Sequence, residues 1–524
     1  MDKRAKFKEG IHMKKLATLL LAAGLVFSAA TGASAIDFKA KGQWLMSFDY
    51  GQDMISKNRN GRNVGGSGYS NKSDSFDAQQ RVRLQLDAVA SESLSGTVYF
   101  EIGNQRWGQA TNGGALGADG TVVEVKRAYL DWIVPQTDLK IRMGLQGVAL
   151  PAFSNGASQV FDNDVAGITA SYKFNDTVAA TLLWARPYND NFEGDETLGH
   201  RASKNFLDNL DMFALLVPLT FDGVKVTPWV SYAAVGKNVS VNLDDSENVG
   251  SNNKYTSYYV AGMTPAAYAQ KNGKRGDAYG SAFWAGITGE VTVADPFRFA
   301  WDANYGSYTN GIEAQKREGY YLSILGEYKM DWATPGLYAW YSSGDDSNVK
   351  NGSERMPSLS ADSASDGFST YATIGDPYIA RDGVLSNNWI GTWGIGARLK
   401  DISYLEDLKH TFRINYIAGT NSPTMAKYIM GKKGYTDRAI HGANMGTHDF
   451  RGAYGTYLTT QDSGLEFGLT TTYKIYDNLN MFADMNYIAM FMDQSRSVWG
   501  TNKDGKHIQL QDPWNINVSF VYDF

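Results

Sequence analysis

The last eleven residues of the chain alternate between apolar and polar side chains. Counting back from Phe524, every second residue is apolar or aromatic: Tyr522, Phe520, Val518, Ile516 and Trp514. Most of the residues between them are polar: Asp523, Ser519, Asn517 and Asn515. A repeat of two residues is the period of a β-strand, so the segment predicts a strand with one apolar and one polar face. A strand of a soluble sandwich would show the same alternation, so this segment alone does not decide the fold class.

Similar alternating segments recur along the chain and predict about 18 strands. We expect them near 38–50, 77–90, 94–104, 123–134, 138–146, 165–174, 178–186, 210–221, 224–234, 281–293, 296–306, 318–329, 336–342, 390–400, 408–418, 465–475, 479–491 and 514–524. Sixteen strands is the alternative, because 336–342 is short and 210–234 is ambiguous in phase. Tilted strands of about 9–11 residues cross a bilayer, which matches most of these lengths.

The connections between these segments are alternately short and long. The short ones consist of turn-forming residues, for example Asp222-Gly223 and Asp477-Asn478. The long ones cover roughly 51–76, 105–122, 147–164, 187–209, 235–280, 307–317, 343–388, 419–464 and 492–513. A soluble sandwich or propeller has no reason to keep its long loops on one side. The pattern therefore predicts an all-β fold, a transmembrane antiparallel β-barrel with short periplasmic turns and long extracellular loops.

The N-terminal region has the pattern of an export signal. Met13-Lys14-Lys15 is basic, Leu16 to Phe27 is almost wholly apolar, and Ala33-Ser34-Ala35 is a cleavage site of small residues. We expect 1–12 to be an over-extended start, 13–35 a cleaved signal peptide, and 36–524 a single barrel domain. After Ala35 no apolar run reaches 18 residues, and no linker divides the chain. The predicted location is the outer membrane of a Gram-negative bacterium.

Charge and composition narrow the class of protein further. Residues 1–35 hold six of the 49 Lys and Arg and two of the 55 Asp and Glu, so 36–524 carry 43 basic and 53 acidic residues, a net charge of −10. This balance argues against a nucleic-acid partner. The chain has no cysteine, although an exported protein could form disulfides. Its membrane partners would be lipid and lipopolysaccharide.

If the apolar face of each strand meets lipid, the other face lines the interior and carries many charges. Five basic residues on neighbouring strands would form a ladder: Arg81, Arg83, Arg127, Lys140 and Arg142. Charges in a dry core cost several kcal/mol unless they are paired, so we expect a water-filled lumen. The ladder would favour anions; alternatively, its members pair with Glu101 and Asp131 and only brace the wall. Both roles are compatible.

The long connection 147–164 is unusually apolar for an exposed loop. It begins Gly147-Val148-Ala149-Leu150-Pro151-Ala152-Phe153 and ends near Asp162 and Asp164. We expect this third long loop to fold inward and narrow the pore. Its two aspartates would then supply the acidic side of a transverse field across the channel, opposite the basic ladder.

Four segments resemble the outer-membrane homotrimeric porins of sulfate-reducing bacteria. They are Met13-Lys14-Lys15-Leu16-Ala17-Thr18-Leu19-Leu20, Ile36-Asp37-Phe38, Val125-Lys126-Arg127-Ala128-Tyr129-Leu130-Asp131-Trp132 and Pro335-Gly336-Leu337-Tyr338-Ala339-Trp340-Tyr341-Ser342-Ser343-Gly344-Asp345-Asp346. The resemblance implies a homotrimer and passive uptake of small hydrophilic solutes, including anions such as sulfate or organic acids. The general porins of enteric bacteria share an arginine ladder and an inward loop, with Arg81, Arg83, Arg127 and Arg142 as counterparts. Their loop carries Pro-Glu-Phe, whereas Pro151-Ala152-Phe153 lacks the carboxylate, which favours anions.

The alternative functions are a substrate-specific sugar or solute channel, with inward Tyr99, Tyr129, Tyr321 and Trp340, and a barrel enzyme or adhesin. No hydrolase elbow or phosphate-binding loop occurs in the sequence, so we expect no enzyme activity and no cofactor. Acidic residues in the long loops, Asp345 and Asp346 among them, offer a weak candidate site for Ca²⁺. Solvated loop charge is the simpler interpretation.

Overall fold

The computed structural model describes residues 36–52, 55–57, 75–110, 114–117, 123–189, 209–236, 279–361, 367–373, 384–386, 388–431, 457–493, 495 and 509–524. The expected start and signal peptide, 1–35, lie outside the described residues. Within the described part the chain is almost entirely β-structure. The helical elements there are η6 (Glu313–Gln315) and α3 (Pro423–Gly431). No helix in this part is both long and apolar enough to cross a membrane.

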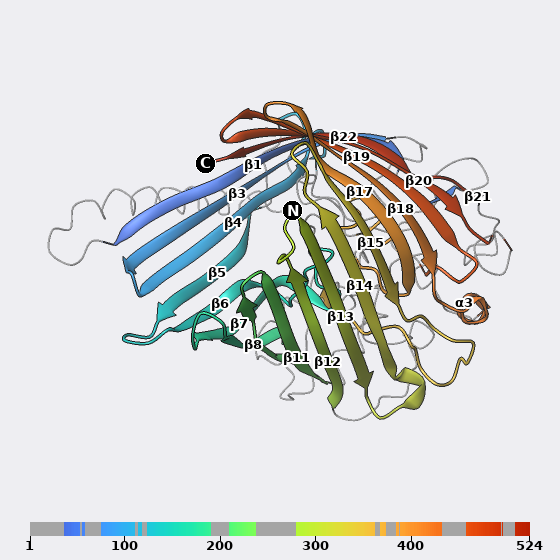
Figure 1. Ribbon diagram of the computed structural model, residues 1–524, viewed down its shortest axis with the longest axis horizontal. Helices are drawn as coiled ribbons and strands as arrows, with labels where there is room; N and C mark the ends of the chain where they lie inside the picture. Colours follow the sequence, from blue (N-terminus) through green and yellow to red (C-terminus); the bar gives the residue numbers. More distant parts are fainter. Residues whose placement is uncertain are drawn as a thin grey trace, which may run out of the picture.

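The strands form one closed antiparallel barrel (Figure 1). Its wall consists of β1 (Asp37–Gln52), β3 (Ser75–Ser91), β4 (Leu94–Arg106), β5 (Val123–Ile133), β6 (Leu139–Ala149), β7 (Phe161–Lys173), β8 (Ala179–Asn189), β9 (Asn209–Leu216) continued by β10 (Leu219–Phe221), β11 (Val224–Gly236), β12 (Tyr279–Val291), β13 (Phe297–Thr309), β14 (Arg317–Tyr328), β15 (Thr334–Ser342), β17 (Thr392–Leu405), β18 (Leu408–Gly419), β19 (Ser463–Tyr476), β20 (Leu479–Phe491) and β22 (Trp514–Asp523). Two short strands, β2 (Ser56–Lys57) and β21 (Gln509–Leu510), pair with each other outside this sheet. The last short strand, β16 (Ser360–Ala361), pairs with β7 in parallel.

The barrel has 18 strands, and the alternative of sixteen is wrong. The main sheet contains 20 segments, of which β10 continues β9 and β16 is an added parallel piece. The doubtful segment 336–342 is a full wall strand, β15, paired on both sides. The doubtful phase near 210–221 has a local cause. Pro218 has no N–H to donate, so the strand breaks there into β9 and β10.

Closure occurs between the two ends of the chain. β1 pairs with β22 on one side and with β3 on the other. The terminal Phe524 exchanges backbone hydrogen bonds of 2.8 and 3.0 Å with Gly42, and its ring lies 5.6 Å from the ring of Trp44. Closure leaves no open edge in the barrel, which is the condition for a sheet in lipid.

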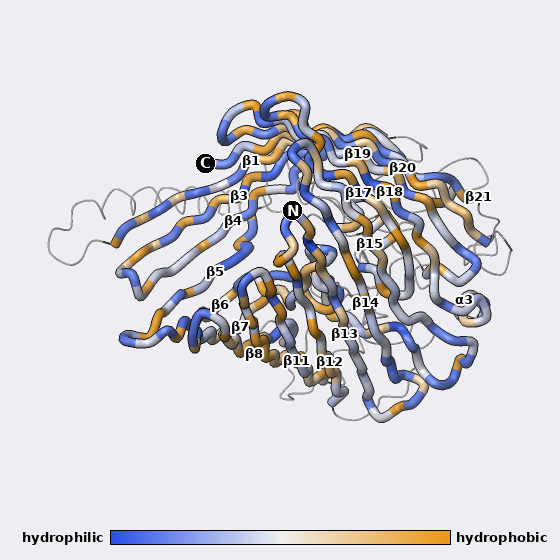
Figure 2. The backbone as a smooth tube through the Cα atoms, in the orientation of Figure 1, coloured by the Kyte–Doolittle hydropathy of each residue, from blue (hydrophilic) through white to orange (hydrophobic). Residues whose placement is uncertain are grey.

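The polarity of the wall is inverted relative to a soluble barrel. Along β13, Phe297 and Phe299 are 58% and 46% exposed, whereas the alternate residues Ala300 and Asp302 are 0% and 2% exposed. The same alternation of apolar and polar residues runs along the other strands (Figure 2). An apolar outer surface on a closed sheet is stable when lipid covers it. The expected strand phase is therefore confirmed.

The interior is not uniformly wet, and here the expectation of an open water-filled lumen is wrong in part. Large aromatic side chains are fully buried inside the barrel, among them Trp284, Tyr321, Tyr371 and Trp389. They belong to one cluster that joins inward faces of wall strands to residues from the long connections. Some of the charges that we expected to require water, such as Asp302 and Glu466, instead accept hydrogen bonds from these connections, as described below.

Candidate functional site: an ion-paired row beside a filled half of the lumen

The third long loop folds into the barrel. We call its residues 150–160, which connect β6 and β7, the inward loop. Phe153 N and Ser154 N donate to the carboxylate of Asp302 over 2.7 and 2.9 Å, and the Ser154 hydroxyl donates to it as well. Asp302 lies on β13, and four strands, β8, β9, β11 and β12, separate β13 from β7 in the wall. The inward loop therefore crosses the lumen.

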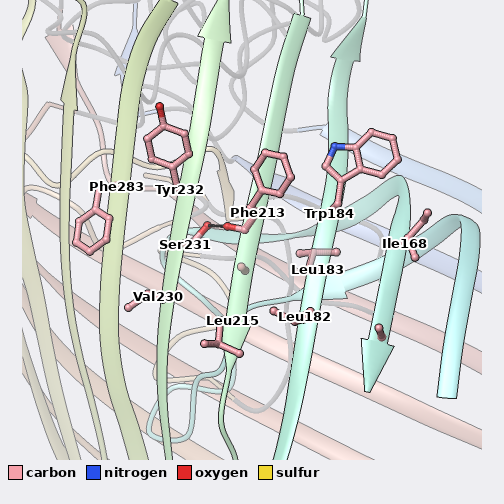
Figure 3. A pocket seen from close by; sticks show the side chains of 12 residues that line it. Ile168, Leu182, Leu183, Trp184, Phe213, Leu215, Val230, Ser231, Tyr232 and Phe283 are labelled. Carbon is pink, nitrogen blue, oxygen red and sulfur yellow. Dashed lines mark hydrogen bonds between the residues drawn. The ribbon is translucent and has the colours of Figure 1, made fainter. Parts of the chain in front are cut away.

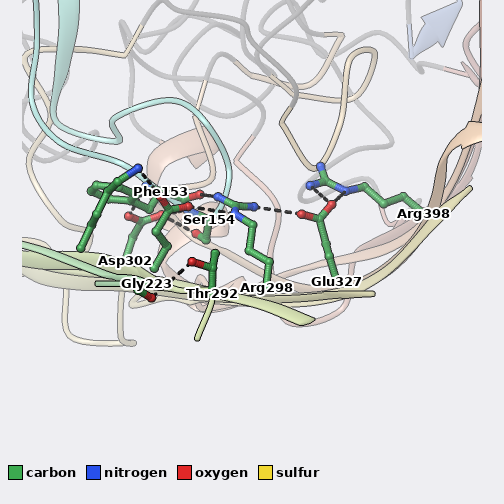
Figure 4. A network of polar contacts seen from close by, with 10 residues as sticks. Phe153, Ser154, Gly223, Thr292, Arg298, Asp302, Glu327 and Arg398 are labelled. Carbon is green, nitrogen blue, oxygen red and sulfur yellow. Dashed lines mark hydrogen bonds and ion pairs between the residues drawn. The ribbon is translucent and has the colours of Figure 1, made fainter. Parts of the chain in front are cut away.

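A chain of ion pairs continues from the anchor of the inward loop along the wall (Figure 4). Arg298 donates to the carbonyl oxygen of Phe153 over 3.0 Å and to Glu327 over 2.9 Å. Glu327 also accepts from Arg398 over 2.7 Å. Each charge has an opposite partner or a backbone donor, which is why these groups tolerate burial.

A second connection, between β15 and β17, also enters the barrel. We call its described parts, 343–361, 367–373, 384–386 and 388–391, the second inward segment. Glu466 of β19 accepts from Ser369 Oγ over 2.7 Å and from Ala372 N over 3.0 Å. Phe368 stacks on Tyr338, with ring centroids 4.3 Å apart. This segment thus packs against the wall at β15 and β19.

The two inward elements contact each other as well as the wall. Leu359 N donates to the carbonyl of Val160 over 2.9 Å, and Trp389 N donates to Gln159 Oε1 over 2.7 Å. Together they fill the side of the lumen that faces β12 to β19. Sequence reasoning missed the second inward segment. Its signal was available, because Phe368, Tyr371 and Trp389 are large aromatic residues in a connection that we expected to be exposed.

The opposite side of the lumen, along β3 to β6, carries five basic side chains that remain partly exposed. We call them the basic row: Arg83 (23% exposed), Lys126 (26%), Arg142 (30%), Arg127 (39%) and Lys140 (48%). They share three carboxylates, so the row keeps a local surplus of positive charge. It is accessible to water, in contrast to the filled side.

The pairs within the basic row are short and specific. Arg83 Nε lies 2.7 Å from Glu101. Arg142 binds Asp131 through two hydrogen bonds of 2.6 and 2.8 Å, and Lys140 lies 3.3 Å from the same carboxylate. These are the partners expected if the ladder braces the wall. Because these cations are partly exposed, their pairing with the wall is also compatible with a role in ion selectivity.

Asp164 lies beside the basic row rather than opposite it. Its carboxylate is 2.6 Å from Arg127 and 2.7 Å from Lys126. Strand register explains this position, because Asp164 is opposite Gly147, where a Cβ would lie 2.6 Å from Nη2 of Arg127. The missing side chain makes room for the guanidinium. Asp164 therefore does not face the basic row across the channel, as we had expected it to.

Two expected site residues have other surroundings, and one residue that we did not expect joins the basic row. Arg81 is 5% exposed and lies at a register shift between β3 and β4, so it is part of the wall rather than of the open surface. Asp162 is opposite Ala361 of β16. Lys126, which we did not expect to point inward, joins the row because a register shift between β4 and β5 adds one residue at this point.

The two aspartates proposed for Ca²⁺ already have protein partners. Asp345 is buried and accepts from the hydroxyls of Ser353 and Tyr457. Burial and the Asp345 charge hold the pKa of Tyr457 well above its usual value. Asp346 accepts from Asn348 N over 2.6 Å. In the part of the chain that the structure describes, no group of three His, Asp or Glu side chains is placed to hold a metal ion, so the Ca²⁺ site stays a prediction.

Comparisons with known proteins give a limited picture. No family model matches the chain, and no curated protein matches it. Solved structures to which it is similar include Acinetobacter baumannii OccAB3, at 11% identity and a TM-score of 0.48, covering 93% of this chain and 100% of that one. Another is a BenF-like porin from Pseudomonas fluorescens Pf-5, at 8% identity and a TM-score of 0.47, covering 93% and 99%.

A third is Pseudomonas aeruginosa OpdK with vanillate, at 9% identity and a TM-score of 0.46, covering 93% and 99%. Because the identities are so low, the function proposed below rests on the geometry of this chain. The likeness to porins of sulfate-reducing bacteria stays a prediction.

Proposed function

We propose that this protein is an outer-membrane channel for passive diffusion of small hydrophilic solutes, and that the basic row makes it favour anions such as sulfate or organic acids. The observation that carries the proposal is the unequal filling of the lumen. One side is packed by the two inward elements, while the other presents five partly exposed cations that share three carboxylates. A solute that crosses the barrel must pass along these cations.

The size of the expected selectivity follows from Coulomb's law. A unit charge about 6 Å from a permeating ion in water contributes about 0.7 kcal/mol, or about threefold in permeability. Screening reduces this effect when the Debye length falls from about 10 Å at 0.1 M salt to about 3 Å at 1 M. Anion preference should therefore be strongest at low salt.

The test is the reversal potential of the refolded chain in a planar bilayer under a salt gradient. Arg127→Gln and Arg142→Gln should each lower anion over cation permeability by about threefold at 0.1 M salt. Lys409→Gln is the matched control, because Lys409 lies at the start of β18 beside the short turn, where it pairs with Asp401. Absence of ohmic steps would refute a channel, and equal reversal potentials in all four proteins would refute selectivity by the basic row.

A second candidate, a substrate-specific channel, is favoured by two aromatic contacts in the basic row. The guanidinium of Arg142 lies 4.1 Å from the ring centre of Tyr129, and that of Arg127 lies 5.8 Å from that of Tyr99. Such pairs offer flat surfaces beside fixed charge, which suits a planar anion. Saturable current blocked by added solute would favour this candidate over free diffusion. The other two expected aromatic residues, Tyr321 and Trp340, are buried and do not line the passage.

The homotrimer is also part of the proposal. Its support is the resemblance of the four sequence segments. The mass of the purified protein in detergent, measured by light scattering with the detergent contribution subtracted, tests it. A monomer at all protein concentrations would contradict it.

A further inference from the structure

An apolar groove lies on the outer face of the barrel at β7 to β12 (Figure 3). Its volume is about 510 Å³, within the range of about 300–1,000 Å³ that is usual for small-molecule sites. The side chains that line it and point outward are almost all apolar, among them Ile168, Leu182, Phe213, Leu215, Val230 and Phe283. This groove faces away from the lumen and belongs to no part of the passage described above.

One end of the groove carries a polar cluster on the same outward face. Figure 3 shows Trp184 and Tyr232 at one end of the groove, nearer the carboxyl ends of β8 and β11, with Leu182, Leu215 and Val230 toward the other end. Trp184 Nε1 donates to Asp211 over 3.0 Å. Arg186, the next outward residue of β8, binds the same carboxylate through Nε and Nη2, over 2.8 and 3.1 Å.

The ion pair between Arg186 and Asp211 lies on the outer face of the barrel, where charged side chains are unusual. Charged side chains on the outside of a membrane barrel are destabilising near the midplane and tolerated near the interfaces, where Trp and Tyr also gather. The cluster therefore marks the level of the lipid headgroups. Within the described residues, Nη1 of Arg186 has no hydrogen-bond partner, and the side chain is 35% exposed. A guanidinium has five N–H donors, of which Asp211 takes two here, so it is suited to bind a phosphate group as well.

We propose that this groove is a binding site for one phosphate-bearing acyl lipid of the outer leaflet. The acyl chain lies along Leu182, Phe213 and Leu215, and Arg186 binds the phosphate while Asp211 and Trp184 hold the guanidinium in place. Charge and shape both support this assignment. The cation lies at the end of the groove near the membrane interface, and the apolar surface extends from it toward the membrane midplane. The inference rests on the proposed outer-membrane location.

The experiment measures lipid retention by the full chain with native mass spectrometry. The purified protein is exposed to phosphatidic acid or to diacylglycerol with the same two acyl chains. We expect one phosphatidic acid per chain, retained in preference to diacylglycerol. Arg186→Gln should lower that preference about tenfold. Leu182→Trp, which fills the groove, should lower retention of both lipids at least tenfold.

The matched control is Leu337→Trp, since Leu337 is 69% exposed on the outer face of β15 and Leu182 is 59% exposed on β8. Equal retention by Leu182→Trp and Leu337→Trp, or an unchanged preference in Arg186→Gln, would overturn the proposal. Leu215→Cys adds a thiol to a cysteine-free chain. Efficient disulfide cross-linking of two copies through it would also overturn the proposal, since a second copy would then occupy the groove. Conductance recorded on the same preparations separates failure of this site from failure of the channel.

Discussion

Replacing Asp302 by alanine is expected to release the inward loop from the wall and to make the channel conductance larger and noisier. The Asp302 carboxylate accepts from Phe153 N over 2.7 Å, from Ser154 N over 2.9 Å and from the Ser154 hydroxyl. Its exposed fraction is 2%, so water does not substitute for it. In Asp302→Ala the two backbone donors lose this acceptor, and the Ser154 hydroxyl keeps only Ser323 Oγ, 2.6 Å away.

The magnitude follows from the number and kind of these bonds. Hydrogen bonds to a charged acceptor contribute about 1.5–3 kcal/mol each. The three bonds share one carboxylate and are not additive, and removal of a buried charge offsets part of the loss, so we take about 3 kcal/mol for the set. That corresponds to more than about 100-fold in the ratio of attached to detached loop. The hydrogen bond of 2.8 Å from Asn155 to Tyr321 of β14 is not removed, so the loop should loosen at Phe153 and Ser154 but stay in the lumen.

Single-channel recording in planar bilayers is the assay. Asp302→Ala should show a higher mean conductance and frequent steps between sublevels. Asp302→Asn keeps the volume but offers one acceptor oxygen to donors that now use both carboxylate oxygens, so its conductance and noise should lie between those of Asp302→Ala and the wild type. The reasoning fails if Asp302→Ala, shown to be folded by its heat-dependent shift on electrophoresis, conducts with the amplitude and noise of the wild type.

Three further changes probe the site. Gly147→Val should displace the guanidinium of Arg127, because even a Cβ would lie 2.6 Å from Nη2. Since the charge moves but stays in the protein, the reversal potential should shift part of the way toward that of Arg127→Gln, and wild-type selectivity would argue against this. Glu466→Ala removes the acceptor of three donors, Ser369 Oγ, Ala372 N and Asn415 Nδ2. It should cost about 2–4 kcal/mol of unfolding free energy, seen as a lower urea midpoint, and an unchanged midpoint would contradict it. Phe368→Ala should cost about 3–5 kcal/mol and expose the second inward segment to protease, and equal cleavage rates in variant and wild type would disprove that packing role.

Strand positions were predictable because the alternation of apolar and polar residues within each strand reflects the environments of its two faces. Phe297 and Phe299 are exposed on the outer face and the alternate residue Asp302 is buried inside, so neighbouring residues along the strand carry the pattern. The one interruption, at Pro218, is also local, since proline cannot donate to a neighbouring strand. The pairs with Glu101 and Asp131 follow from strand neighbours, and Arg142 with Asp131 is a directly opposite pair, whereas Arg127 reaches Asp164 across β6.

The filling of the lumen could not be predicted in the same way. Ser369 and Glu466 are 97 positions apart, and Ser154 and Asp302 are 148 apart. No local pattern states which inward charge will be met by which connection. The sequence showed only that apolar side chains such as Phe368 stand in a segment expected to be exposed.

By itself, the sequence determined a closed cylinder with an apolar outside and a charged inside, because lipid and the lumen impose opposite preferences on successive residues of every strand. Only the tertiary structure decided which inward charges are buried against the long connections and which remain accessible to water. That choice depends on long-range partners such as Asp302 with Ser154, whose hydrogen bonds repay the desolvation of the carboxylate once the chain has folded.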